Sequence, residues 1–155
     1  MPRILIFYAT TDGHTAKVAR RFGADLQAAG ATVHIVDADA GHLDPSPRDY
    51  DAVVVAASLH LIGYQRSVLR WVQAHHRDLT VMPSAFLSVG LALLQPDPAA
   101  RQEVTATQER FFATTGWRPT FCRDVAGAIP YSRYGWLRRR TVQKIARKAG
   151  METDT

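Results

Sequence analysis

The chain has 155 residues, a formal net charge of +5 and 46% hydrophobic residues. This length suits a single domain, residues 1–155, and no apolar run reaches the roughly 20 residues that a membrane-spanning helix needs. The single cysteine, Cys122, excludes an intramolecular disulfide and a metal site built from several cysteines. Because no signal-peptide pattern precedes the first apolar run, we expect a protein of the reducing cytoplasm.

The chain opens with an apolar run at residues 4–9, short enough for a buried parallel strand. Small and hydroxylated residues follow, and apolar residues at helix spacing begin at Ala16. A strand, a hydroxyl-rich loop and a helix N-terminus together favour an anion, because the helix dipole and its unpaired N–H groups point at the loop. The candidate anion-binding residues are Thr10, Thr11, Asp12, Gly13, His14 and Thr15.

This loop lacks the Gly-Lys-Ser/Thr ending of nucleotide triphosphate sites and the Gly-x-Gly-x-x-Gly pattern of dinucleotide sites. No lysine or arginine lies between Ala9 and Ala16. Neutral donors suit a phosphate monoester, such as that of FMN, better than a triphosphate with Mg²⁺. The alternative is an ordinary turn in which Thr11 or Asp12 only caps the helix.

Strands and helices alternate along the rest of the chain. Strands are predicted at residues 32–36, 52–57, 85–89 and 120–129, and helices at 65–76 and 99–114. Strands that are apolar throughout predict an α/β fold, a three-layer sandwich in which helices cover both faces of a five-stranded parallel sheet. With an anion loop after the first strand, the expected order is 2-1-3-4-5, with the ligand site at the carboxyl ends of the strands.

Histidine and cysteine patterns add no catalytic or metal site. His60, His75 and His76 are accompanied by no carboxylate cluster and no His-Glu-x-x-His motif, so we predict no metal. Cys122 follows Phe121 in a predicted strand and is expected in the core. The sequence identifies no acid–base residue.

Motifs spread over the whole chain carry a family resemblance. They are Thr10-Thr11-Asp12-Gly13-His14-Thr15, Ala57-Ser58-Leu59-His60 with Tyr64, Met82-Pro83-Ser84-Ala85-Phe86, Trp117-Arg118-Pro119, Ala126-Gly127-Ala128, Tyr131-Ser132-Arg133-Tyr134 with Trp136, and Gly150-Met151-Glu152-Thr153-Asp154-Thr155. In these motifs the chain resembles the menaquinone-dependent protoporphyrinogen IX dehydrogenases, the flavodoxin-like enzymes of haem synthesis.

The resemblance implies a flavodoxin-like fold, FMN as cofactor, and oxidation of protoporphyrinogen IX with menaquinone or ubiquinone as acceptor. A flavodoxin-type electron carrier, or a quinone reductase of other specificity, is the alternative. With the phosphate on residues 10–15, the residues expected beside the isoalloxazine ring are Ser58, Leu59, His60 and Tyr64, and those expected at its pyrimidine edge are Ser88, Val89, Gly90 and Leu91. The plainer interpretation of both groups is an ordinary surface loop and a strand end.

A basic segment at residues 131–149 carries seven cations and no acid, whereas the rest of the chain has 12 basic and 14 acidic residues. Its aromatic residues and cations suit an anionic membrane surface, where a quinone is found, and the propionates of a porphyrinogen are a second candidate. A solvated basic helix is the alternative, and nucleic acid is disfavoured. The candidate anion-binding residues are Arg133, Arg138, Arg139, Arg140 and Lys144.

Members of the resembling family continue past the Glu-Thr-Asp-Thr motif into a further helix, which this sequence does not contain. That helix covers part of one face of a flavodoxin sheet. The resemblance therefore implies a shortened sequence, or a face covered by the basic segment or by a second subunit. A homo-oligomer located on the inner face of the cell membrane is one expectation.

Overall fold

The computed structural model describes residues 1–41, 44–60, 63–90, 97–125, 143–145 and 147–148. Within them, five parallel strands form one sheet in the order β2-β1-β3-β4-β5, which confirms the predicted class and order. Residues 126–129 of the predicted fifth strand lie outside the described part. The observed bounds are β1 Arg3–Tyr8, β2 Thr32–Asp37, β3 Ala52–Ser58, β4 Ser84–Val89 and β5 Phe121–Val125.

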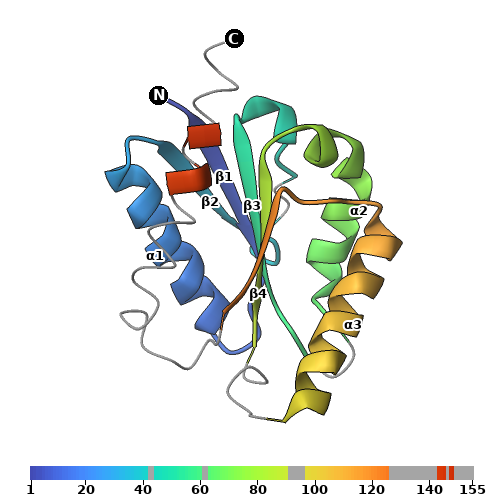
Figure 1. Cartoon of the computed structure of the whole chain (residues 1–155). Helices are drawn as coiled ribbons and strands as arrows, with labels where there is room; N and C mark the ends of the chain where they lie inside the picture. Colours follow the sequence, from blue (N-terminus) through green and yellow to red (C-terminus); the bar gives the residue numbers. More distant parts are fainter. Residues whose placement is uncertain (42–43, 61–62, 91–96, 126–142, 146, 149–155) are drawn as a thin grey trace.

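Helices cover both faces of the sheet (Figure 1). α1 (His14–Ala28) lies on one side, and α2 (Arg66–Val81) and α3 (Pro98–Thr115) lie on the other. A short 3-10 helix, η1 (Pro47–Asp49), precedes β3. The predicted three-layer sandwich is therefore confirmed.

The second helix is longer than the sequence predicts. We expected it to end at residue 76, whereas α2 continues to Val81. The apolar face extends to Leu79, which is fully buried. The helix then ends because Pro83 disfavours a helical conformation for the residue before it, and Met82 is extended.

β1 and β3 form the centre of the core. All seven residues of β3 are buried, and so is every residue of β1 after the first. Alternate side chains of β1 point to opposite faces. Ile4 and Ile6 pack with α1, whereas Leu5 and Phe7 pack with α2 and α3. Burial on both faces explains why these strands are apolar throughout.

Aromatic side chains attach α3 to β4. The rings of Phe86 and Phe111 are stacked with their centroids 4.9 Å apart. Trp117, which is fully buried, meets Phe86 edge-on at 5.8 Å. Its indole Nε1 donates a hydrogen bond to Ser84 Oγ at 3.0 Å, so the polar atom of this large side chain is satisfied inside the core.

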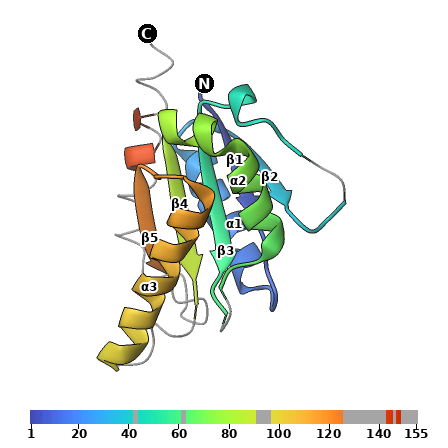
Figure 2. The same cartoon turned by 90° about the vertical axis from the view of Figure 1, so that its right-hand side faces the viewer.

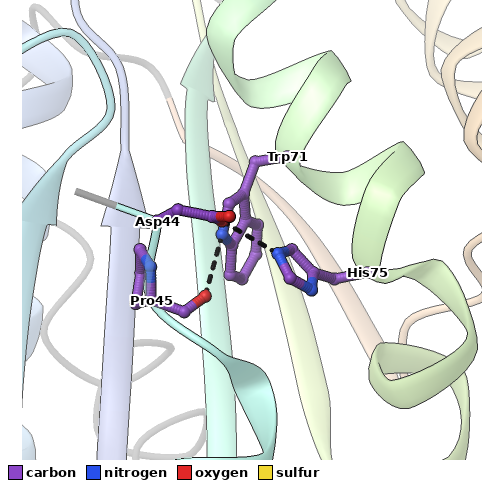
Figure 3. A network of polar contacts seen from close by, with 4 residues as sticks. All are labelled: Asp44, Pro45, Trp71 and His75. Carbon is purple, nitrogen blue, oxygen red and sulfur yellow. Dashed lines mark hydrogen bonds and ion pairs between the residues drawn. The ribbon is translucent and has the colours of Figure 1, made fainter. Parts of the chain in front are cut away.

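The connection between β2 and β3 is fastened to α2 (Figure 3). Trp71 Nε1 donates to the Pro45 carbonyl at 3.1 Å, and His75 Nε2 lies 3.0 Å from Asp44 Oδ1. The Trp71 ring also stacks on Phe7 of β1, with centroids 4.2 Å apart. One side chain of α2 therefore bridges the sheet and this connection.

The described part of the basic segment, residues 143–145 and 147–148, is helical and lies beside β5 (Figure 2). Ile145 is 3% exposed and belongs to the core cluster that α1 covers. The ammonium groups of Lys144 and Lys148 lie 5.6 and 5.1 Å from the centroid of the Phe121 ring. This part of the segment thus covers the start of β5 on the α1 side.

Gly23 lets α1 approach the sheet closely. A Cβ atom built at this position would lie 2.8 Å from Ile35 Cδ1 and 3.3 Å from Ile6 Cδ1. The methyl group of an alanine at this position would meet only the end of the Ile35 side chain, which can move. A branched side chain would be too large for the space between α1 and the sheet.

We predict that Gly23→Val lowers the free energy of unfolding by about 1–3 kcal/mol, through overpacking between α1 and β2. Urea unfolding followed by circular dichroism measures this change. Ala24→Val, at the exposed neighbouring position of the same helix, is the matched control. This control should lower the free energy of unfolding only by the difference in helix propensity between Ala and Val, less than about 0.7 kcal/mol. Equal losses in the two variants would contradict the proposed close approach.

Candidate functional site

The loops that follow β1, β3 and β4 meet at the carboxyl edge of the sheet. The Leu59 N–H donates to the Val89 carbonyl at 2.8 Å, so the loop after β3 stays joined to the end of β4. The Gly90 N–H donates to the Val125 carbonyl at 2.9 Å, so the loop after β4 stays joined to β5. The backbone ladder therefore extends past the strands and aligns the loops that the sequence analysis singled out.

The loop after β1 leads into a helix N-terminus without a side-chain cap. Gly13 is the N-cap residue at φ +87°, a conformation that favours glycine, and its N–H donates to Thr10 Oγ1 at 2.9 Å. The alternative in which Thr11 or Asp12 caps α1 is wrong, because Gly13 is the N-cap residue and α1 begins at His14, one residue later than an Asp12 cap requires and two later than a Thr11 cap requires. Among the described residues no side chain accepts a hydrogen bond from its first turn, and that turn contains no acidic residue.

The first turn of α1 therefore offers N–H groups to an anion. The first intrahelical bond runs from the Lys17 N–H to the Gly13 carbonyl at 3.2 Å. The N–H groups of His14, Thr15 and Ala16 have no carbonyl partner within the helix. They lie at the positive end of the helix dipole, which is the arrangement that the predicted anion site requires.

A hydroxyl network joins this loop to the loop after β3. Thr15 Oγ1 lies 2.9 Å from Ser58 Oγ, and both side chains are buried. Gln65 Nε2 donates to Ser58 Oγ at 2.8 Å and to Thr11 Oγ1 at 3.1 Å. The Ser58 N–H in turn donates to Gln65 Oε1 at 3.1 Å.

Gln65 is the site residue that sequence reasoning missed. It is the residue immediately before α2, and it contacts Thr11, which lies 54 residues earlier in the chain. No local pattern marks a glutamine for such a contact. Its place directly after Tyr64, the last residue of a loop already assigned to the site, was the available signal, although the sequence places it at the start of the predicted helix 65–76.

Tyr64 links the loop after β3 to β4. Its hydroxyl lies 2.6 Å from Ser88 Oγ, and its ring meets Phe86 and Phe111 edge-on at 5.0 and 5.1 Å. Burial raises the pKa of the Tyr64 hydroxyl well above its ordinary value, so this group stays protonated. Stacking of Tyr64 on a flavin stays a prediction, since both aromatic contacts of its ring are with the core.

The other predicted residues lie around the same edge. His60 and Gly63 exchange two backbone hydrogen bonds of 3.0 Å, which closes a tight turn with the His60 side chain exposed. Val89 is buried, whereas Leu59 and Gly90 are half-buried. Leu91 lies outside the described residues.

Of the predicted anion-binding cations, the structure describes Lys144, which is exposed above Phe121. Arg133, Arg138, Arg139 and Arg140 lie outside the described residues. In the part of the chain that is described, no three His, Cys, Asp or Glu side chains gather to hold a metal ion. No helix in the same part is long and apolar enough to cross a membrane.

Cys122 lies half-buried in β5 against the aromatic cluster of α2 and α3. Burial, followed by the negative charge of Asp124, raises the pKa of its thiol to about 11. The reactive form of cysteine is the thiolate. At neutral pH Cys122 is therefore a packing residue, although it is half-buried against the core and not inside it as we expected from the sequence.

Comparison with known proteins gives the family context. The family model described as "Flavodoxin domain" matches residues 5–155. The chain is 33% identical over 158 residues to an Escherichia coli (strain K12) protein named protoporphyrinogen IX dehydrogenase (quinone), covering 99% of this chain and 83% of that protein. A protein of the same name from Leishmania major is 32% identical over 158 residues, covering 99% of this chain and 66% of that protein.

Solved structures share the fold at low sequence identity. The rubredoxin oxygen:oxidoreductase of Desulfovibrio gigas superposes with a TM-score of 0.71 at 17% identity, covering 99% of this chain and 37% of that chain. A flavodoxin of Streptococcus pneumoniae TIGR4 superposes with a TM-score of 0.63 at 14% identity, covering 97% of this chain and 99% of that chain. At these identities the likeness concerns the fold alone.

We predict that Cys122 reacts slowly with iodoacetamide in the folded protein. Its pKa of about 11, against 9.0 for an ordinary thiol, leaves about 100-fold less thiolate at pH 8. Mass spectrometry of the alkylated protein reports on this residue alone, because the chain has one cysteine. Above pH 9 the unfolded chain loses the thiol proton while the folded chain keeps it, so stability should fall as pH rises towards 11.

The rate of alkylation in urea-unfolded protein is the reference for an unprotected thiol. The Cys122→Ser variant measures the background reaction of other side chains. A midpoint of alkylation below pH 9 in the folded protein would contradict the prediction and indicate an activated thiol.

Proposed function

This chain belongs to the flavodoxin-domain family and, within it, to the protoporphyrinogen IX dehydrogenases (quinone), and from that premise we propose that it oxidises protoporphyrinogen IX to protoporphyrin IX, with FMN as cofactor and a membrane quinone as acceptor. Its relatives make it a flavodoxin-like oxidoreductase, as the sequence resemblance implied. The observation that carries the proposal is the likeness to these dehydrogenases over nearly the whole chain.

Family membership indicates a flavin site, and the residues at the carboxyl edge suit the phosphate of FMN. The uncapped first turn of α1 provides N–H donors, Gly13 leaves the loop open to a close approach, and no acidic side chain in that turn repels an anion. Near the same turn, Thr10 Oγ1 accepts from the Gly13 N–H and Thr11 is exposed, whereas Thr15 is fully buried against Ser58. We therefore propose residues 10–15 as the phosphate site.

The rest of the flavin is proposed to lie along the two neighbouring loops. Ser58, Leu59, His60 and Tyr64 would flank its ring, and Ser88, Val89, Gly90 and Leu91 its pyrimidine edge. When bound, FMN supplies the electron transfer between the porphyrinogen and the quinone. The chain's own contribution is to bind and orient: the bond between Tyr64 and Ser88 holds these loops together with a hydroxyl that stays protonated.

We propose that the basic segment places the enzyme on an anionic membrane, from the cytoplasmic side. Quinones are dissolved in the bilayer, and each basic residue near an anionic surface contributes about 1 kcal/mol. Lys144 is exposed beside β5 and is available for such a contact. The residues proposed to bind lipid headgroups, or the propionates of the substrate, are Arg133, Arg138, Arg139, Arg140 and Lys144.

We predict that the protein binds FMN at least about 100-fold more tightly than riboflavin, since the two flavins differ only in the phosphate. That factor corresponds to about 2.7 kcal/mol, within the range of one or two charge-assisted hydrogen bonds. Quenching of flavin fluorescence during titration gives both dissociation constants. Equal dissociation constants for FMN and riboflavin would contradict the assignment of the phosphate to residues 10–15.

We predict that the FMN-loaded protein oxidises protoporphyrinogen IX under anaerobic conditions when menaquinone is present. The rate should be higher with menaquinone in anionic vesicles than in neutral vesicles, and salt should reduce the difference by screening the basic segment. Porphyrin fluorescence follows the product. A soluble quinone analogue separates the two steps, because its reduction needs no membrane.

Two outcomes of this assay would revise the proposal. Equal rates on neutral and anionic vesicles would contradict the electrostatic role of the basic segment. Reduction of quinone by another donor, with protoporphyrinogen left unchanged, would favour the flavodoxin-type carrier or a quinone reductase of other specificity.

A further inference from the structure

We propose that Gln65 is a positioning residue for the flavin phosphate, because its amide nitrogen donates to the hydroxyl oxygens of Thr11 and Ser58 and so leaves the proton of the exposed Thr11 hydroxyl free to donate to an anion. This inference rests on the proposed FMN site. It concerns a side chain that lies in the loop after β3 and acts on the loop after β1.

The orientation of the Gln65 amide follows from its contact with the backbone of β3. The Ser58 N–H can only donate, so the amide atom 3.1 Å away is the oxygen, Oε1. The other atom of the amide is therefore the nitrogen, Nε2. It lies 2.8 Å from Ser58 Oγ and 3.1 Å from Thr11 Oγ1.

This orientation decides the role of each hydroxyl. An amide nitrogen carries two protons, and Gln65 uses both, one on Ser58 and one on Thr11. Each of these hydroxyl oxygens therefore accepts, and each keeps its own proton for donation. A third hydroxyl, that of Thr15, shares one of the three protons with Ser58. Two protons remain for an acceptor outside the network.

Thr11 is the exposed member of the network. Thr15 is fully buried and Ser58 is 7% exposed, whereas Thr11 is exposed. Thr11 also belongs to the loop that leads, through Gly13, to the uncapped first turn of α1. An anion at that turn would therefore meet a hydroxyl whose oxygen is held by Gln65 and whose proton is not used by Gln65, which lowers the cost of ordering the site.

Gln65→Glu tests this role. The carboxylate still accepts from the Ser58 N–H, but it cannot donate, so the hydroxyls of Thr11 and Ser58 turn their protons towards it. The added negative charge also opposes the phosphate. We expect the dissociation constant for FMN to rise by about 10-fold to 100-fold, while that for riboflavin changes by less than about 3-fold. A merely structural role would change both constants together.

Two further variants complete the experiment. Gln65→Met removes the hydrogen bonds without adding charge, and it should reduce the preference for FMN by about 5-fold to 10-fold. It keeps the test valid if Gln65→Glu fails to fold, as judged by circular dichroism. Gln27→Glu makes the same change of charge at an exposed position about 20 Å along α1 from the anion loop, and it should leave both constants unchanged.

The failure of this proposal can be told from the failure of the FMN site. If the unchanged protein binds FMN and riboflavin equally, the phosphate site itself is wrong. If the unchanged protein prefers FMN and both Gln65 variants keep that preference in full, the site stands and the role of Gln65 is overturned.

Discussion

Burial of the central strands on both faces is the constraint on which the other features of this structure depend. Every residue of β3 is buried, and so are all residues of β4. Strands of this kind have little room for polar side chains within the sheet, so polar chemistry is moved to the strand ends. The loops after β1, β3 and β4 consequently contain the hydroxyl, amide and backbone donors of the candidate site.

Buried hydroxyl groups at the carboxyl edge of the sheet need hydrogen-bond partners, and the adjacent residues Tyr64 and Gln65 provide them. Tyr64 reaches Ser88 at the end of β4, and Gln65 reaches Ser58 at the end of β3 and Thr11 beyond β1. The two residues before α2 therefore join the loop after β1 to the ends of β3 and β4. Hydrogen bonds that satisfy buried hydroxyls in this way also define the shape of the site.

The fold does not select the reaction. Proteins with names as different as a flavodoxin and a rubredoxin oxygen:oxidoreductase superpose on this chain. Function belongs to the residues that a fold presents at its site, and here the family rests on identity in sequence over nearly the whole chain. We propose that the residues at the carboxyl edge and the basic segment are the parts of this chain that select substrate and acceptor.

The sequence by itself predicted the strands of the sheet from continuous apolar runs and the helices from helix spacing, because both are local patterns. The strand order followed from the general rule for parallel sheets of this kind, and the structure confirms it. The anion loop, which rests on hydroxyl residues before a helix, stays a prediction. Tertiary structure decided the rest. The length of α2 depends on Leu79 meeting the core, and the partners of Tyr64 include Phe111, 47 positions further along the chain. Gln65 and Thr11 meet across 54 residues, a pairing that exists only once two neighbouring strands place their loops at the same edge.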